Sequence, residues 1–328
     1  MKRYLLLLFW LVIQASVLTA SDKAKQEGKG LIEQAEAKTN IFALPSLEMK
    51  ANVRIENKGK PLDGSYLLLW NGPEQWREEI SFPDYNEVQV GGKGIVFLKR
   101  STDFIPVRID QLHSALGYGS GMRQSFIHVA LGPDETVKKI HDRKINGSKA
   151  DCVEVSDHDN HIREVCVDGP TGVLVRRDPF LDRELMPVGA KLFPRFMSYV
   201  ENGKPLVEIQ VTELKATDQL PPSAFEPPPG AVSKPGCMNP NPPHLVKRVM
   251  PRYPEQERQS HVEGTVSINA LIGKDGSVSE LRIVSGVTPG LNKASLDAVQ
   301  QWRYEPATCN GVVLDIEAVL TVNYSLLF

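Results

Sequence analysis

Residues 296–306 read LDAVQQWRYEP, and this run determines how the C-terminal part of the chain folds. From Leu291 onward, apolar and polar side chains fall on opposite faces of a helix that turns about 100° per residue. The apolar face holds Leu291, Ala294, Ala298, Val299 and Trp302, and the polar face holds Lys293, Asp297, Gln300 and Gln301. We therefore expect a helix over residues 291–302 that covers one face of a sheet and cannot continue through Pro306.

The same run offers no catalytic group. Trp302 lies on the apolar face, so its default role is core packing. Arg303 stands at the helix exit, where a cation complements the helix dipole. Glu305 has no acidic or histidine partner nearby, and the seven histidines of the chain are scattered. We predict neither catalytic residues nor enzymatic activity.

Residues 245–328 are expected to form a compact α+β module. The stretch EGTVSINALI (263–272) alternates apolar and polar side chains as a strand does, and GKDG (273–276) is a hairpin turn. SVSELRIVS (277–285) returns antiparallel, and VVLDIEAVLTVNYSLLF (312–328) supplies a last strand. With a short helix over residues 253–261, helices would cover one face of an antiparallel sheet.

Five motifs of this module resemble the TonB C-terminal domain in order and spacing. They are Tyr253-Pro254, Glu263–Val266, Asp275–Val278, the helix around Ala298, and Trp302–Pro306. The resemblance covers about residues 245–328. It implies a periplasmic domain that recognises an extended peptide, the TonB box of outer-membrane transporters, by adding it as a strand to the edge of its sheet.

The resemblance also implies which residues meet the partner, an outer-membrane transporter or another periplasmic protein. The edge would be the final strand, around Leu314–Val322, assisted by the segment before Tyr253. The implied partner-binding residues are Met250, Tyr253, Leu314, Ile316, Ala318, Leu320 and Val322. Some members of the family have glutamine where this chain has Met250, and that departure bears on specificity.

Residues 22–219 are expected to form a large, curved antiparallel β-sheet domain. From Met49 to Lys99, short β-rich runs alternate with turn signals, and LFPRFMSYV (192–200) and LVEIQVTEL (206–214) form a final hairpin. Further strands are expected near residues 136–144, 149–155, 162–167 and 173–177. A brief helix is expected over 108–116, because Ile109, Leu112 and Leu116 share one face. Trp70 and Trp76 flank a turn and are expected to pack across strands; lining a ligand cavity is the other interpretation.

This succession, with FEPPPGA (225–231) at its end, is similar to the half-barrels of LolA-type lipoprotein carriers. That likeness implies an apolar cavity for acyl chains. It gives an alternative function: a carrier or sensor of a lipid or other apolar ligand, whose C-terminal domain docks a partner. Between the two domains, residues 220–244 contain nine prolines. We expect an extended linker there, with a reach of up to ~80 Å at ~3.1 Å per residue.

The N-terminus has the layout of an export segment. Residues 1–21 combine a basic start, an apolar run from Tyr4 to Ile13 and small residues from Ala15 to Ser21, as in a signal peptide. Residues 4–20 are also at the short end of the length that spans a bilayer, so an inner-membrane anchor is the other interpretation. Either one places the body of the chain in the periplasm. Residues 4–20 contain no histidine, unlike the anchors of energy-transducing family members, so coupling to a proton-driven complex is not expected.

Four cysteines fit an oxidising compartment. ADCVEV (150–155) and IREVCV (162–167) form a predicted hairpin that places Cys152 opposite Cys166, and a pair between Cys237 and Cys309 follows by elimination. The loop DHDNH (157–161) holds potential metal ligands, but solvated Asp, Asn and His collect at hairpin tips, so we expect no metal or cofactor. With 38 basic and 40 acidic residues, the chain lacks the excess of positive charge that attracts nucleic acid.

Overall fold

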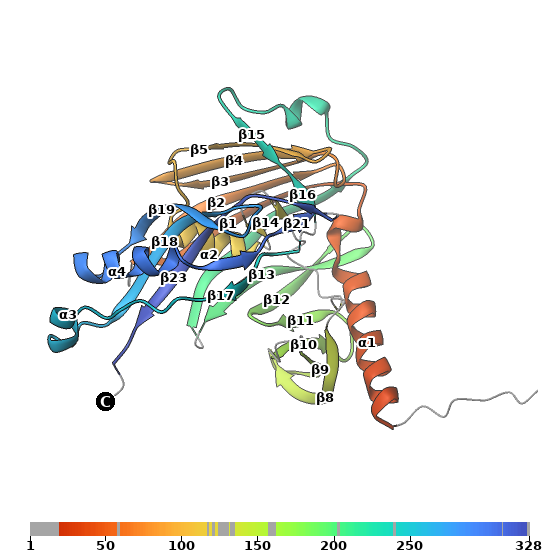
Figure 1. The fold of residues 1–328 in the computed structure, drawn as a ribbon. Helices are drawn as coiled ribbons and strands as arrows, with labels where there is room; N and C mark the ends of the chain where they lie inside the picture. The colour runs from red at the N-terminus through yellow and green to blue at the C-terminus, as the bar shows by residue number, and fades with distance from the viewer. Residues whose placement is uncertain are drawn as a thin grey trace, which may run out of the picture.

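The computed structural model describes residues 20–57, 60–116, 118–119, 122–123, 131, 135–156, 162–201, 204–238, 241–309 and 311–326. The predicted export segment, up to residue 19, and the DHDNH loop (157–161) lie outside these residues. Within them, no helix combines the length and the apolar character that crossing a membrane requires. The chain folds into a large β-domain and a smaller α+β module, as predicted (Figure 1).

Thirteen antiparallel strands form the sheet of the large domain, in the order β15-β5-β4-β3-β2-β1-β14-β13-β12-β11-β10-β9-β8. The strands are β1 (Ser46–Asn57), β2 (Lys60–Trp70), β3 (Trp76–Phe82), β4 (Tyr85–Gly92), β5 (Ile95–Arg100), β8 (Thr136–Ile145), β9 (Ser148–Ser156), β10 (Ile162–Asp168), β11 (Leu174–Arg177), β12 (Phe180–Val188), β13 (Lys191–Glu201), β14 (Lys204–Thr217) and β15 (Val232–Pro235). Pairing of β1 with β14 joins two meanders into one sheet. The predicted antiparallel sheet is confirmed.

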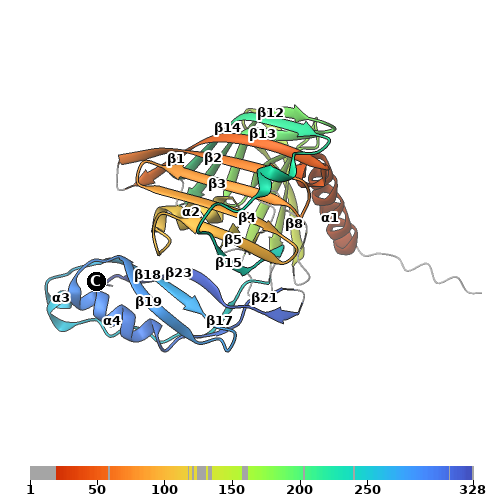
Figure 2. The same ribbon diagram turned by 90° about the horizontal axis from the view of Figure 1, so that it is seen from above.

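The sheet curls around α2 (Val107–Ala115), which lies against β1 and β14 (Figure 2). Ile109, Leu112 and the following Leu116 are fully buried, as the helical spacing predicted. They join one apolar cluster with the inward-facing residues of the strands. In that cluster Trp70 lies opposite Trp76 across β2 and β3, so their predicted cross-strand packing is confirmed.

The sequence pattern does not predict one helix of the large domain. α1 (Ala20–Thr39) packs along β8, β10, β11 and β13 and buries Ile32. Gly28 permits this close approach, because a Cβ at that position would come within 2.9 Å of Val137 Cγ1. The helix carries lysine and glutamate around most of its circumference, and this weak amphipathic pattern explains why it escaped prediction.

The C-terminal module has a three-stranded antiparallel sheet in the order β19-β18-β23, with helices covering one face. Its main elements are α3 (Glu255–Gln259), β18 (Gly264–Ile272), β19 (Val278–Ser285), α4 (Pro289–Val299) and β23 (Ile316–Tyr324). The predicted extension of α4 to Trp302 is wrong. The helix ends at Val299, and Arg303–Glu305 form β20, which pairs with β17 (His244–Lys247).

Two side chains explain how the end of α4 is held. Trp302 is buried although it lies beyond the helix, and its Nε1 donates to the carbonyl of Val249 at 2.9 Å. Arg303 Nη1 donates to the carbonyl of Trp302 at 2.7 Å and to that of Gln300 at 3.3 Å. A cation therefore stabilises the last turn, as the sequence indicated.

The proline-rich stretch 220–244 is attached to the folded domains along much of its length. It contains the 3₁₀ helix η2 (Pro222–Phe225), the edge strand β15, and β16 (Cys237–Met238), which pairs with β7 (Met122–Arg123). An edge strand suits proline, because the N–H that proline lacks is not needed on the side where the strand has no neighbour. The remaining short elements are η1 (Ile41–Ala43), β6 (Tyr118–Gly119), β21 (Thr308–Cys309) and β22 (Val312–Val313).

The first predicted disulfide is confirmed. Cys152 lies directly opposite Cys166 in the ladder between β9 and β10, and the two form a disulfide. Cys309 is also a disulfide cysteine. The side chain of Cys237, its predicted partner, lies outside the part of the chain that the structure describes.

A buried polar cluster lies where β4 meets α2. His113 Nε2 is 2.9 Å from Glu87 Oε1, and both side chains are 2% exposed. Gln89 and Tyr85 hydrogen-bond the same carboxylate. Burial alone would raise the pKa of Glu87, but His113 and the hydrogen bonds outweigh it and hold that pKa at about 2. The carboxylate therefore stays ionised, and it fixes α2 to the sheet.

Asp110 lies one turn before His113 on α2, and its pKa is shifted in the opposite direction. Burial raises the pKa of Asp110 from its ordinary 3.8 to about 6; His113 opposes the rise and Glu317 of β23 adds to it. The folded protein keeps a proton on Asp110 between about pH 4 and pH 6 that the unfolded chain gives up. The contribution of Asp110 to the free energy of unfolding therefore falls as the pH rises through that window.

Replacing both Cys152 and Cys166 with alanine should lower the free energy of unfolding by roughly 3 kcal/mol, because the disulfide closes a loop with a sequence separation of 14. The shift in the urea unfolding midpoint under oxidising conditions measures this. An unchanged midpoint would mean that this disulfide does not constrain the unfolded chain.

Asp110→Asn should raise the free energy of unfolding at pH 7.5 by roughly 1–3 kcal/mol, since it removes a carboxylate that burial disfavours. The gain should disappear near pH 4, where Asp110 is protonated in both states. Urea titrations at several pH values give both numbers, and Asp218→Asn, an exposed site, serves as the control. A gain that does not depend on pH would contradict this account of Asp110.

Candidate functional site

β23 is one of the two edge strands of the three-stranded C-terminal sheet, and β19 is the other. β23 is nine residues long and pairs with β18 from Gly264↔Tyr324 to Ile272↔Ile316. Among the described residues, β18 is the only strand that it pairs with. Roughly half of its backbone N–H and C=O groups therefore face away from β18. Such an edge is a template for another strand.

The side chains of the predicted edge residues belong to the core of the module. Leu314, Ile316, Leu320 and Val322 are each less than 10% exposed, and Ala318 is half-buried against the same cluster. They pack in one apolar cluster with residues of α4 and β18, so they are not free to form pockets for a partner on that side. What these residues present at the edge is their main chain.

Tyr253 and Met250 have different surroundings. The Tyr253 ring packs edge-on against Tyr324, the last residue of β23, with centroids 5.1 Å apart. Its hydroxyl donates to the carbonyl of Val262. Met250 is 71% exposed and follows Val249, whose carbonyl is held by Trp302. The structure thus brings Tyr253 to the end of β23 and leaves Met250 as an apolar side chain on the surface.

The other face of β23 meets the large domain, which the sequence did not indicate. Arg100, the last residue of β5, donates from Nη2 to both carboxylate oxygens of Glu317 at 2.9 Å each. Lys234 Nζ on β15 lies 3.4 Å from the same carboxylate. Two residues further along, Val319 packs against the apolar cluster of the large domain. Figure 2 shows the module lying beside β15 and α2.

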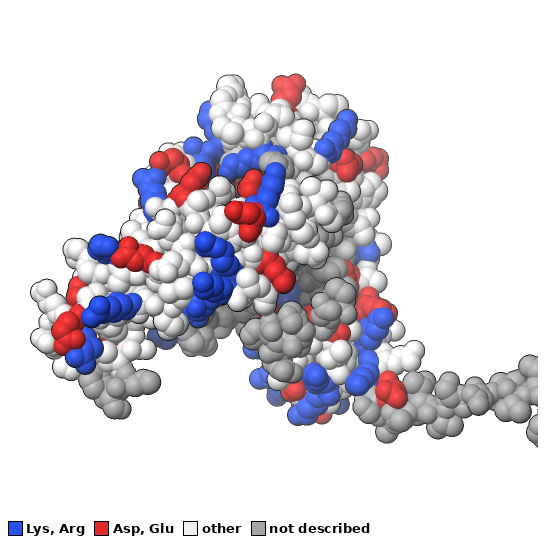
Figure 3. Space-filling model, viewed as in Figure 1, with Lys and Arg blue, Asp and Glu red and all other residues white. Residues whose placement is uncertain are grey.

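β19 makes a second set of contacts with the large domain. Arg282 Nη1 lies 2.6 Å from Asp103, and the guanidinium stacks 4.5 Å from the centroid of the Phe104 ring. Between these contacts and Glu317, the two domains border a partly open cavity of about 430 Å³. Its lining is mostly polar: Arg100, Asp103, Lys234, Asn269, Ala270, Leu271, Glu280, Arg282, Asp315 and Glu317. On the face seen in Figure 3, basic and acidic side chains are interspersed.

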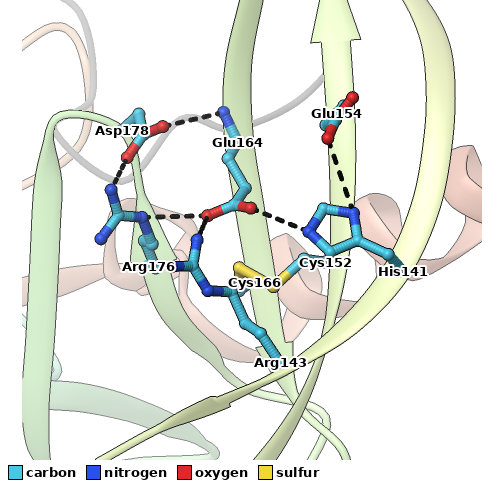
Figure 4. The surroundings of a disulfide bond; sticks show 8 residues. All are labelled: His141, Arg143, Cys152, Glu154, Glu164, Cys166, Arg176 and Asp178. Carbon is cyan, nitrogen blue, oxygen red and sulfur yellow. Dashed lines mark hydrogen bonds and ion pairs between the residues drawn. A yellow bond between two sulfur atoms is a disulfide. The ribbon is translucent and has the colours of Figure 1, made fainter.

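One cluster of potential metal ligands lies elsewhere, beside the disulfide. Ligand atoms of His141, Cys152 and Glu164 lie within 4.8 Å of one another. The Cys152 sulfur is bound to Cys166, and the Glu164 carboxylate is occupied by Arg143 at 2.6 Å and Arg176 at 3.1 Å (Figure 4). Two guanidiniums disfavour a further cation at this carboxylate. The cluster has the chemistry of a salt-bridge network between β8, β10 and β11.

Residues 249–326 match the family model of the Gram-negative bacterial TonB protein C-terminal domain. Protein TonB from Klebsiella pneumoniae is 31% identical over 91 residues, which are 26% of this chain and 37% of that protein. The chain thus spans just over a third of the length of this curated relative.

Two solved structures are similar to the large domain. A DUF1329 family protein from Desulfovibrio piger matches 62% of this chain and 97% of its own, with 10% identity and a TM-score of 0.42. A LolA superfamily protein from Nitrosomonas europaea matches 61% of this chain and 97% of its own, with 12% identity and a TM-score of 0.35. For residues 249–326, the resemblance carried by the five sequence motifs is confirmed: this part of the chain is similar to the C-terminal domain of TonB proteins.

Proposed function

We propose that the C-terminal module binds an extended segment of a partner protein as an additional strand along β23. The observation that carries this proposal is that β23 has a single strand neighbour over its nine residues. A guest strand would gain main-chain hydrogen bonds along this edge, independently of most of its side chains. The match of residues 249–326 to the TonB C-terminal family supports the same reading.

The partner that this module suits is a protein of the bacterial envelope. By analogy with TonB, it is an outer-membrane transporter or another periplasmic protein that offers an extended peptide. The proposed location is the periplasm, with residues 4–20 either removed after export or kept as an anchor. The disulfide between Cys152 and Cys166 agrees with an oxidising compartment.

The alternative function, a carrier of an apolar ligand, requires open apolar space on the inner face of the large sheet. In the described part of that face, Ile109 and Leu112 of α2 are fully buried against the strands, and Trp70 and Trp76 pack on each other. This packing favours a role for the large domain as a folded platform. We therefore keep strand addition as the main proposal.

The test uses the full-length chain and a TonB-box peptide of an outer-membrane transporter as the probe. Two N-methylated forms of the peptide are compared: one is methylated at every second residue, and the other at the alternate residues. In an added strand only one of these sets points its N–H groups toward β23. One form should bind about 10- to 100-fold more weakly than the unmodified peptide, and the other should bind equally well.

Fluorescence anisotropy with labelled peptide gives the affinities. Equal weakening by both methylation patterns would show that the peptide binds without joining the sheet. Failure of the unmodified peptide to bind would remove this peptide class from the proposal.

A further inference from the structure

We propose that the large domain acts as a latch on the C-terminal module: docking of the two domains competes with the addition of a guest strand to β23. The inference rests on the proposed function, because it concerns the same strand. It goes beyond that function by giving the large domain a role in controlling when the edge is available.

The strongest contact of the latch is the pair of Arg100 and Glu317. Their side chains are only 12% and 13% exposed, so water screens the pair much less than it screens a surface ion pair. Lys234 adds a second cation near the same carboxylate. Arg100 and Lys234 belong to the large sheet, whereas Glu317 lies one residue into β23. The ion pair thus joins the edge of the large sheet to the candidate binding strand.

The competition follows from the geometry of an added strand. A guest would lie ~4.8 Å from β23, and every second side chain would project onto the face that carries Glu317 and Val319. Val319 already packs against the large domain, and Glu317 is held by Arg100. Guest side chains on this face therefore enter space beside β23 that borders the docked domain. We infer that full seating of the guest requires the domains to separate.

The character of the interface makes separation feasible. Apart from Val319, the contacts named above are ionic or involve a cation over a ring, and a cavity of about 430 Å³ lies between the domains. Val319 and the cavity residues Ala270 and Leu271 are the apolar part of this interface, and inter-domain contacts that rest largely on charged groups permit domain motion. Because charges carry the contact, higher ionic strength should favour the open arrangement.

Domain opening and peptide binding are linked equilibria, and this link determines the measured peptide affinity. If the closed arrangement excludes the guest, the apparent affinity is lowered by the fraction of molecules that are open. A change outside β23 that opens the latch, such as one at Arg100, should therefore tighten peptide binding without altering the edge itself. Conversely, bound peptide should hold the domains apart.

The test uses charge reversal in the full-length chain. Arg100→Glu and Glu317→Arg each place like charges together, and the double variant restores an opposite pair in reversed order. Arg183→Glu, which changes an arginine that is 44% exposed on β12, is the control for net charge. Small-angle X-ray scattering measures domain separation without peptide, and anisotropy measures the affinity for the TonB-box peptide.

Each single variant should increase the radius of gyration and tighten peptide binding by roughly tenfold, within the range of ordinary coupling between sites. The double variant and Arg183→Glu should resemble the unmodified chain in both measurements. Circular dichroism confirms that the variants are folded, and restored behaviour of the double variant excludes a general folding defect.

Two results would overturn the latch. If single variants leave the scattering unchanged, the ion pair does not hold the domains. If they separate the domains but leave peptide affinity unchanged, docking and binding do not compete, although strand addition itself would stand. Absence of peptide binding in every variant, with domain separation as expected, would instead place the failure in the proposed function.

Discussion

The ion pair between Arg100 and Glu317 sets the arrangement on which the functional reading depends. It joins the last residue of β5 to an edge strand of the C-terminal module, across a sequence separation of 217. Together with Arg282 on Asp103 and with Val319, the pair holds the sheet face opposite the helices against the large domain (Figure 2). The candidate edge therefore borders the gap between the domains.

Two kinds of feature were accessible from the sequence. Local periodicity identified α2 through Ile109 and Leu112, and it identified most strands of the large sheet. Register in a short hairpin identified the pairing of Cys152 with Cys166. These predictions succeed because neighbours in the chain are neighbours in space in a meander, so a pattern of a few residues contains the relevant contacts.

Features that depend on distant contacts were missed. Glu317 and Val319 occupy the solvent-facing positions of an alternating strand, and nothing in that pattern indicates that a second domain covers them. α1 was missed because its mixture of lysine, glutamate and alanine gives a weak apolar stripe. The end of α4 was misplaced because pairing of β20 with β17, a tertiary contact, overrides the helical period before Pro306.

Residue-resolved amide hydrogen exchange over Ile316–Tyr324, measured in the full-length chain with and without the TonB-box peptide, tests the central claim most directly. If a guest strand joins this edge, the amides that point away from β18 should become protected on peptide addition, while those already bonded to β18 should change little. Unchanged exchange along β23 in the presence of saturating bound peptide would contradict the account, because the partner would then be held by some other surface.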